Sequence, residues 1–574
     1  MTMRTTGRPA VTGRHWAVST GHWLATAAAV RILERGGNAI DAGVAGAMAL
    51  GVLQPDIVGF TGVSPMIIYL AERDEVVTVS GLGRWPRAAS VDYFERRHGG
   101  DLPMGVERCV TPASIDAWCQ ALRDYGTIGF AEAVEPALEL ARDGFATHRL
   151  LATVIAEDEA NFRRWPSSAA VMLPRGQVPA VGELFRQSDL ARTIERLTAA
   201  EKRATGGRNG GLEAVRNCFH EGEVARDILT FMAAGGGLMT AADLADFSSG
   251  REAPEMIRFG DWEVYSCGPW CQGPMVLEFL QLYQSFESTT SAINSSGYVH
   301  SLTELMKLGF ADREAYFGDP DMVDVPLGDL LSADYARTRV RAVDPGQAAP
   351  DLPLAGETRL GRPDMPWVRE ARISQHAARV HTDTTYLCVA DGAGNGFSCT
   401  PSDGYSTAPV MPGLGFTVST RGDQSWVDRR HPSSIAPWKR PRLTPNPALA
   451  KKDGKLALLF GTPGGDVQCQ AMLQTFLNIA THGMDPQTAI EAPRFASESF
   501  PNSFHPHRHK PGVLRLEHEL GHLTDDLKAM GHVVEPWPQG SWRAGGVCAI
   551  RITPETGDKT AGADPRRECY AAAW

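Results

Sequence analysis

Two adjacent threonines, Thr384 and Thr385, precede a segment that could carry nucleophilic chemistry. The next residues, 386–389 (YLCV), have the aromatic and branched apolar content of a buried strand. A glycine-rich turn at 391–395 then leads into a second predicted strand at 396–400. If the backbone were cut before Thr384, the freed amine would lie beside the hydroxyl of the same residue and could accept its proton. One residue would then supply both the nucleophile and the base.

A second segment, 461–466 (GTPGGD), offers hydrogen-bond donors for the same chemistry. Gly464 and Gly465 have no side chain that would separate their N–H groups from a bound substrate. The segment precedes an apolar helix predicted over 468–480, and a helix N-terminus favours negative charge. These are the requirements of an oxyanion hole. A threonine pair at a strand start is usually structural, so this glycine segment is what favours catalysis.

Taken together, these motifs resemble the γ-glutamyltransferase family of the N-terminal nucleophile hydrolase superfamily. The resemblance covers nearly the whole chain and is carried by segments 32–55, 139–148, 307–326, 383–385, 436–449, 461–470, 492–495 and 563–567. Members of this family are made as one inactive chain that cuts itself before the threonine. The resemblance therefore implies a large subunit, residues 1–383, and a small subunit, residues 384–574, which associate after cleavage. The sequence leaves open whether such heterodimers associate into a homo-oligomer.

The hydrophobic pattern places most helices before Thr384 and most strands after it. It predicts helices within 20–52, at 274–286 and at 298–316, strands at 66–70, 75–80 and 262–266, and a surface loop at 199–211. The strands predicted after Thr384 lie at 415–419, 448–449, 456–460, 513–516, 533–534 and 547–552. Sheets flanked by helices indicate an α+β fold. The resemblance implies a four-layer αββα sandwich, one domain built from both subunits.

The stretch before the proposed cut has a different composition. Residues 343–380 are rich in proline, glycine and arginine and show no periodicity. We expect the large subunit to end in a mobile tail at about 343–383, which cleavage would release.

By resemblance, Thr384 acts twice. In the precursor its hydroxyl attacks the carbonyl of Asp383, and in the mature enzyme it attacks a substrate amide with its own α-amine as the base. Gly464 and Gly465 would hold the oxyanion. Ser402, eighteen residues after the nucleophile, falls where the family places a hydroxyl that orients the threonine; a serine at the edge of a hairpin is the structural alternative. The resemblance implies no cofactor and no metal, and its partners are a small amide and water.

The acyl pocket departs from the γ-glutamyl pattern at several positions. Val91 stands where the family has an arginine for the substrate α-carboxylate, and Arg84 and Arg87 are the nearby arginines that could replace it. Gly404 stands in place of an asparagine, and Leu443 begins the pair that replaces two serines. A charged amino-acid head group needs paired counter-charges when it is desolvated. We therefore expect a smaller or less zwitterionic amide, and hydrolysis rather than transfer.

Four residues remain as candidates for substrate binding. Gln424 stands where the family has a carboxylate for the substrate amine, and Asp423 is adjacent to it. Arg421 is available as an anchor for a carboxylate, and Thr444 is the second residue of the altered serine pair. A true γ-glutamyltransferase or glutathione hydrolase is the alternative within the same family.

A rival motif, His518-Glu519-Leu520-Gly521-His522, fits the H-E-x-x-H signature of zinc peptidases. On one helix face the two imidazoles could bind zinc while the glutamate activates water. However, Leu520, Leu523 and Leu527 form the apolar stripe of the predicted helix, which turns both histidines toward solvent. Residues 505–510 (HPHRHK) are interpreted as a surface loop. Besides a zinc peptidase, an unprocessed homologue without catalysis is the other alternative from a different class.

Composition and charge bear on the binding partners, the location and the cysteine chemistry of the protein. The chain has 574 residues with a net charge of −11, which argues against a nucleic-acid partner, since such a partner needs a concentrated basic face. No apolar run of signal-peptide length occurs in residues 1–16, and none elsewhere reaches the ~18 residues of a membrane helix. We therefore expect a cytoplasmic protein that does not bind membranes. Ten cysteines without a C-x-x-C pair indicate free thiols.

Overall fold

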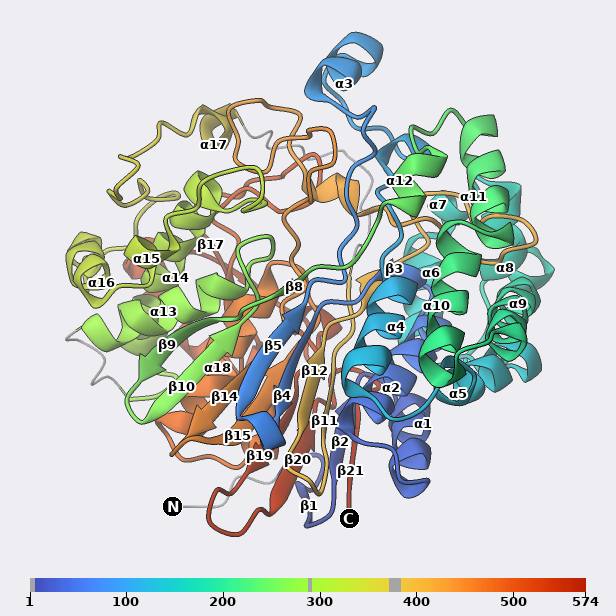
Figure 1. Cartoon of the computed structure of the whole chain (residues 1–574). Helices are drawn as coiled ribbons and strands as arrows, with labels where there is room; N and C mark the ends of the chain where they lie inside the picture. The colour runs from blue at the N-terminus through green and yellow to red at the C-terminus, as the bar shows by residue number, and fades with distance from the viewer. Residues whose placement is uncertain (1–5, 287–291, 371–382) are drawn as a thin grey trace.

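The structure is a computed structural model, and it describes residues 6–286, 292–370 and 383–574. Two seven-stranded antiparallel sheets lie at its centre (Figure 1). In order across the first sheet are β1 (Val11–Gly13), β20 (Lys559–Ala563), β19 (Cys548–Ile552), β15 (Lys455–Gly461), β14 (Ala448–Lys452), β10 (Trp262–Ser266) and β9 (Glu255–Phe259). The second sheet runs β21 (Tyr570–Ala573), β2 (Ala17–Thr20), β11 (Leu387–Ala390), β12 (Gly396–Cys399), β4 (Met66–Leu70), β5 (Glu75–Val79) and β8 (Arg251–Glu252). Each sheet takes strands from both sides of Thr384.

One helical layer covers the outer face of the second sheet. Helices α1 (Trp23–Glu34) and α2 (Ala39–Leu53) pack on this sheet, and α4 (Ser114–Tyr125), α5 (Phe130–Asp143), α9 (Ser188–Arg203) and α10 (Gly207–His220) extend the layer outward (Figure 1). A Cβ atom on Gly43 of α2 would lie 2.1 Å from the ring of Phe397 in β12. The small residues of α2 therefore let this helix lie close against the sheet.

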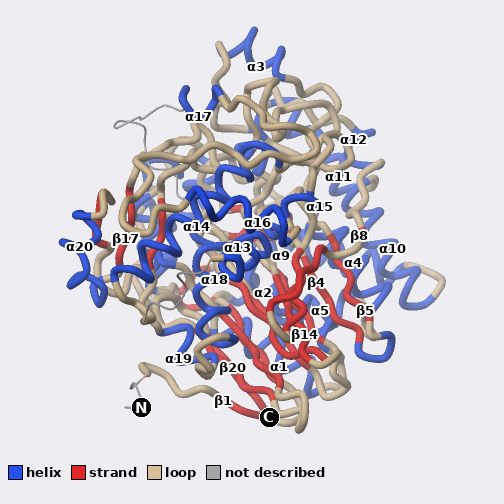
Figure 2. The backbone as a smooth tube through the Cα atoms, turned by 90° about the vertical axis from the view of Figure 1, so that its left-hand side faces the viewer, coloured by secondary structure: helices blue, strands red, loops and turns tan. Residues whose placement is uncertain are grey.

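The other helical layer covers the first sheet. Helices α13 (Gly273–Ser285), α14 (Ser296–Tyr316) and α18 (Val467–Ala480) bury apolar side chains against it. Between the two sheets lies a separate apolar layer that includes Tyr386, Leu459 and Ile550. Figure 2 shows the strands gathered in the lower part of the molecule and many of the loops above them. The layers follow in the order α, β, β, α, so the predicted fold class is confirmed.

The remaining elements are short or lie at the edges of these layers. The helices are α3 (Val91–His98), α6 (Arg149–Glu157), α7 (Glu159–Phe162), α8 (Pro166–Met172), α11 (Glu223–Ala234), α12 (Ala241–Ala245), α15 (Leu327–Leu330), α16 (Ala333–Arg339), α17 (Pro366–Glu370), α19 (Pro486–Glu491) and α20 (Thr524–Ala529). The strands are β3 (Val58–Val63), β6 (Phe145–Ala146), β7 (Leu184–Phe185), β13 (Ser402–Asp403), β16 (Phe495–Ser497), β17 (Val513–Leu516) and β18 (Val533–Pro536).

Two local predictions are wrong. The predicted loop at 199–211 is the end of α9 and the start of α10, because the good helix formers in 199–203 (AAEKR) extend α9 and Gly206, with φ of 94°, allows the chain to turn between the helices. The predicted strand at 415–419 is irregular, and it leads into a 3₁₀ turn at Arg421–Gln424. The apolar residues of this segment are buried without pairing to a sheet.

The stretch that was expected to be a mobile tail lies partly outside the described residues, which omit 371–382. The described part makes specific contacts: the N–H of Ala348 donates to the carbonyl of Met530 at 2.7 Å. All ten cysteines are buried free thiols, as predicted. No helix in the described ranges has both the length and the apolar character needed to cross a membrane.

Candidate active site

Thr384 lies at the entrance to the hairpin formed by β11 and β12. It forms an isolated bridge with Ser402 of β13, and β13 in turn pairs with β3. Its side chain is completely buried, and its hydroxyl oxygen lies 2.9 Å from the Ser402 hydroxyl. The side-chain amide of Gln468, in the first turn of α18, donates to the Thr384 hydroxyl at 3.4 Å. The structure therefore brings together the predicted nucleophile and its predicted orienting residue.

The carbonyl of Asp383, in the peptide bond that precedes Thr384, is held by two donors. The Ser402 hydroxyl donates to the Asp383 carbonyl oxygen at 2.8 Å, and an Nη of Arg421 donates to it at 3.0 Å. The same Arg421 nitrogen also donates to the Ser402 hydroxyl. Hydrogen bonds to a carbonyl oxygen polarise it toward attack. The carbonyl at the predicted cleavage site is therefore polarised by two hydrogen-bond donors.

The side chain of Asp383 is held by a residue that the sequence did not reveal. Its Oδ1 accepts the backbone N–H of Thr384 at 2.8 Å, and its Oδ2 forms an ion pair with Arg567 at 2.6 Å. Arg567 is buried and also donates to the carbonyl of Trp542. The pair joins residues 184 positions apart, so no local pattern could have predicted it.

Gly464 and Gly465 lie beside a cleft of about 560 Å³ that Asp383 and Arg567 also line. Their φ angles are 124° and 56°, in the region that favours glycine. Neither N–H donates a hydrogen bond to any residue in the described part of the chain. Since a backbone N–H normally finds a partner, two free donors next to the cleft fit the predicted oxyanion hole.

The four predicted substrate-binding residues lie close together. Arg421, Asp423 and Gln424 share one 3₁₀ turn, and the amide of Gln424 donates to the hydroxyl of Thr444 at 3.0 Å. Asp423 lines the cleft, and its Oδ2 is 3.8 Å from Arg108. Its Oδ1 accepts no hydrogen bond from the described residues. Burial raises the pKa of Asp423 to about 6, against the attraction of Arg108 and Arg421.

Arg84 and Arg87, considered as replacements for the missing pocket arginine, form ion pairs with acids that do not line the cleft. Arg84 contacts Asp319 at 3.4 Å and Asp321 at 2.6 Å, and Arg87 contacts Asp243 at 3.2 Å. Val91 begins α3 and is buried in an apolar cluster. The structure therefore provides no arginine from this segment to the cleft that it describes.

The loop at residues 505–510 is not the surface loop that the sequence suggested. His505, Pro506 and Arg508 line the cleft, and the buried ring of His507 stacks on Trp426 with centroids 3.8 Å apart. Burial lowers the pKa of His507 to about 3, so this ring is neutral at ordinary pH. Its stacking on an aromatic residue explains why this histidine is buried in a loop that is elsewhere partly exposed.

The H-E-x-x-H segment does not form the α-helix that zinc binding would require. Residues His518–Leu523 form a 3₁₀ helix, and α20 begins only at Thr524. With three residues per turn, positions four apart point about 120° away from each other. His518, Glu519 and His522 are all exposed, as predicted from the apolar stripe, and they do not converge on a common point.

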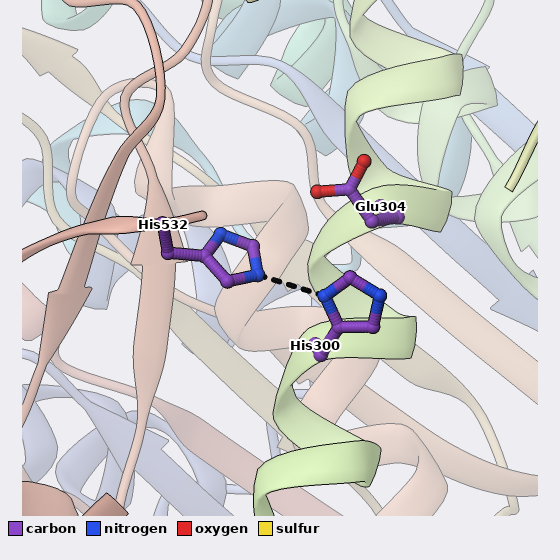
Figure 3. A group of neighbouring side chains, drawn as sticks. All are labelled: His300, Glu304 and His532. Atoms are coloured by element: carbon purple, nitrogen blue, oxygen red, sulfur yellow. Dashed lines mark hydrogen bonds between the residues drawn. The ribbon is translucent and has the colours of Figure 1, made fainter. Parts of the chain in front are cut away.

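Only one group among the described residues has metal-ligand geometry, and it lies away from this motif (Figure 3). His300 and Glu304 of α14 face His532, with 2.9 Å between His300 Nδ1 and His532 Nε2. The ammonium of Lys307 already neutralises Glu304 at 2.7 Å. Burial, aided by Lys307 and His300, lowers the pKa of His532 to about 3. The group is therefore a hydrogen-bonded pair of histidines, of which His532 is neutral at ordinary pH, beside an internal ion pair.

An αββα sandwich with a buried threonine hydroxyl at the start of a central strand is typical of the class of N-terminal nucleophile hydrolases. A family model described as Gamma-glutamyltranspeptidase matches residues 25–574. The chain belongs to this family and is an amide-bond hydrolase or acyltransferase. Both the predicted family and the predicted enzyme class are confirmed.

Three relatives illustrate the similarity. The chain is 32% identical over 561 residues to the Acylase ACY 1 proenzyme of Pseudomonas sp. (strain V22), which covers 95% of this chain and 91% of the relative. The solved structure of LmbA2991T421A matches with a TM-score of 0.92 at 36% identity, over 99% of this chain and 100% of that one. Cephalosporin acylase from Bacillus halodurans matches with a TM-score of 0.84 at 26% identity, over 100% and 98% of the two chains.

Proposed function

We propose that this protein is a self-processing threonine amidohydrolase that cleaves a small amide through an acyl-enzyme on Thr384. The observation that carries the proposal is the geometry at one bond. The Thr384 hydroxyl is held by Ser402 at 2.9 Å, and the carbonyl of the preceding residue accepts hydrogen bonds from Ser402 and Arg421. A buried peptide carbonyl polarised beside a buried hydroxyl is what self-cleavage needs. The relatives named as proenzymes support the same reading.

Cleavage would convert Thr384 into the first residue of the small subunit. Its new α-amine, with an ordinary pKa near ~8, is partly neutral at neutral pH and can accept the hydroxyl proton. The hydroxyl then attacks a substrate amide in the cleft, while the free N–H groups of Gly464 and Gly465 hold the oxyanion. Water opens the resulting ester. The two subunits stay together because each sheet is built from strands of both.

The substrate we propose carries less charge than a γ-glutamyl amide. Arg84 and Arg87 are bound elsewhere, so the segment in which the family places its arginine for an α-carboxylate gives none to the described cleft. The cleft's own arginines are Arg108, Arg508, Arg543 and Arg567. Four aromatic residues line the cleft and favour an apolar or aromatic part in the substrate. They are Phe500, Phe504, Trp537 and Trp542. The acylase name of one relative supports hydrolysis of such an amide.

A true γ-glutamyltransferase is the second candidate, and one observation favours it. Asp423 lines the cleft with an unsatisfied carboxylate oxygen, which would bind the amine of a γ-glutamyl group. Initial rates with glutathione and with a panel of uncharged aryl and alkyl amides separate the two. A higher kcat/KM for glutathione would reject the acylase proposal.

Self-cleavage is tested by intact mass and N-terminal sequencing of the purified protein. We expect two fragments of about 41 and 21 kDa, since 62.0 kDa over 574 residues is about 108 Da per residue, with Thr384 at the start of the smaller one. The Thr384→Ala variant is expected to stay intact and inactive. An active wild-type protein with an uncut chain would refute the proposal, and an uncut chain without turnover would favour a non-catalytic homologue. Loss of turnover with a chelator would instead indicate a zinc enzyme.

A further inference from the structure

We propose that Arg421 is a catalytic residue of the self-cleavage, where its guanidinium and the Ser402 hydroxyl stabilise the oxyanion that forms on the Asp383 carbonyl. This inference rests on the proposed function, because it assumes that Thr384 attacks Asp383. It gives Arg421 a task that the sequence did not suggest, since the sequence pointed only to a substrate carboxylate.

The surroundings of Arg421 show that its charge is directed at the scissile bond. The side chain is almost fully buried, and its guanidinium lies over the ring of Phe504 with 5.5 Å to the centroid. No carboxylate oxygen lies within 4.0 Å of its nitrogens among the described residues, and its Nε has no partner there. A buried arginine with a structural role is normally paired with an acid. Here both hydrogen bonds go to the atoms of the cleavage site.

The hydrogen bonds around Ser402 fix the direction of each proton. A hydroxyl donates once and can accept twice. Ser402 donates to the Asp383 carbonyl at 2.8 Å and accepts from Arg421, so its contact with Thr384 at 2.9 Å must be donated by the threonine. The chain of donors therefore runs from Thr384 through Ser402 to the Asp383 oxygen. This order is a ready path for the proton that the nucleophile must lose.

The first covalent step then balances without an external base. The Thr384 Oγ forms a bond to the carbonyl carbon of Asp383, and the C=O π pair moves to the oxygen. Arg421 stabilises the negative charge that develops on that oxygen during the attack. As the threonine proton passes to Ser402, the Ser402 proton passes to the same oxygen and neutralises it. When this intermediate collapses, the C–N bond breaks and its electron pair takes the hydroxyl proton onto the Thr384 nitrogen. The product is an ester, which water hydrolyses to free the Asp383 carboxylate and the Thr384 hydroxyl.

The donors for self-cleavage are thus different from the donors proposed for turnover. The Asp383 carbonyl accepts from Ser402 and Arg421, whereas neither Gly464 nor Gly465 donates to it. Arg421 is released from the carbonyl only when the bond is cut. From then on it can face a substrate, so the two tasks of this arginine are successive.

The test compares cleavage rates of the full-length chain after cell-free synthesis, measured as the intact fraction against time by mass spectrometry. Arg421→Ala and Arg421→Gln are expected to cleave about a hundredfold more slowly, the usual loss of one oxyanion donor. Added guanidinium ion is expected to speed the alanine variant. Arg87→Ala is the matched control, since Arg87 contacts Asp243 and not Asp383, and it should cleave at the wild-type rate.

Each outcome separates the inference from the function on which it rests. Cleavage of Arg421→Ala or Arg421→Gln at the wild-type rate would overturn the inference alone. Slow cleavage of a folded alanine variant that guanidinium does not accelerate would give Arg421 a structural role and would also overturn it. Cleavage of Thr384→Ala at the same bond would instead refute the proposed function. If the alanine variant does not fold, the glutamine variant decides.

Discussion

Asp423 offers a prediction in which stability and function oppose each other. This buried carboxylate has one unsatisfied oxygen, and its pKa is raised from an ordinary value of 3.8 to about 6, chiefly by burial. Because the pKa in the folded protein lies above that in the unfolded chain, the stabilising contribution of the protonated form is complete below about pH 4. It is lost as the pH rises through about 6. At neutral pH the ionised group therefore destabilises the fold.

The size of this effect follows from the pKa. A difference of roughly two units between the pKa of Asp423 in the folded and in the unfolded chain corresponds to about 3 kcal/mol in the free energy of unfolding, since each unit corresponds to about 1.4 kcal/mol. We expect Asp423→Asn to be more stable than the parent by up to this amount at pH 8 and by little at pH 4. Unfolding entropy is about 2.1 cal/mol/K per residue, so the melting temperature should rise by roughly 2–3 °C. Substrates that carry an amine should lose affinity in the same variant.

Calorimetry over a pH series provides the assay. Both proteins should carry Thr384→Ala, which keeps them in the uncut form that the structure describes. A difference in melting temperature that grows between pH 4 and pH 7 would support the reasoning. A difference in melting temperature that stays constant with pH would refute it. So would a gain in stability of the asparagine variant over its parent that is smaller at pH 8 than at pH 4.

Three further predictions concern the cleavage site. Gly465 has φ of 56°, which is strained for alanine, and the added methyl group of Gly465→Ala would lie 3.3 Å from Phe504. Amide turnover should therefore fall about a hundredfold while self-cleavage persists. Equal loss of both rates would contradict separate oxyanion sites. In the uncut background, Arg567→Ala should lower the free energy of unfolding by about 3–5 kcal/mol, because it leaves Asp383 charged and unpaired. Adding Asp383→Asn should restore part of this loss. If the two substitutions lower the melting temperature additively, the two side chains are not coupled. Ser402→Ala removes both a donor and the proton path, so mass spectrometry should show at least about a hundredfold slower cleavage; a wild-type rate would exclude the relay.

The sequence predicted the elements whose signal is local. The hairpin after Thr384 and strand β10 were predicted because alternation and turn residues mark them directly. The helix at 199–203 was missed because polar and charged residues next to a glycine cluster look like a loop, although they favour a helix when one face is buried. The strand predicted at 415–419 failed for the opposite reason, because an apolar run shows burial but not sheet pairing.

In the candidate site too, local signals could be predicted from the sequence and contacts between distant residues could not. Thr384 and the glycine pair were suggested by residue type and spacing, and Ser402 by the family resemblance; the structure brings Thr384 and Ser402 into contact. Arg567 was not found, since only the folded chain brings it to Asp383. Arg421 was found with a different task, because a sequence shows that a charge is present but not the atom that it faces.

The presence of strands from residues 1–383 and 384–574 in both sheets affects how this protein can be recovered after denaturation. Before the cut, refolding is an intramolecular process whose rate does not depend on dilution. After it, two separate polypeptides must meet and insert strands between one another, so renaturation becomes second order and loses the effective concentration that one chain provides. The severed protein should therefore show marked hysteresis between unfolding and refolding, and its lifetime should depend on the unfolding barrier rather than on an equilibrium.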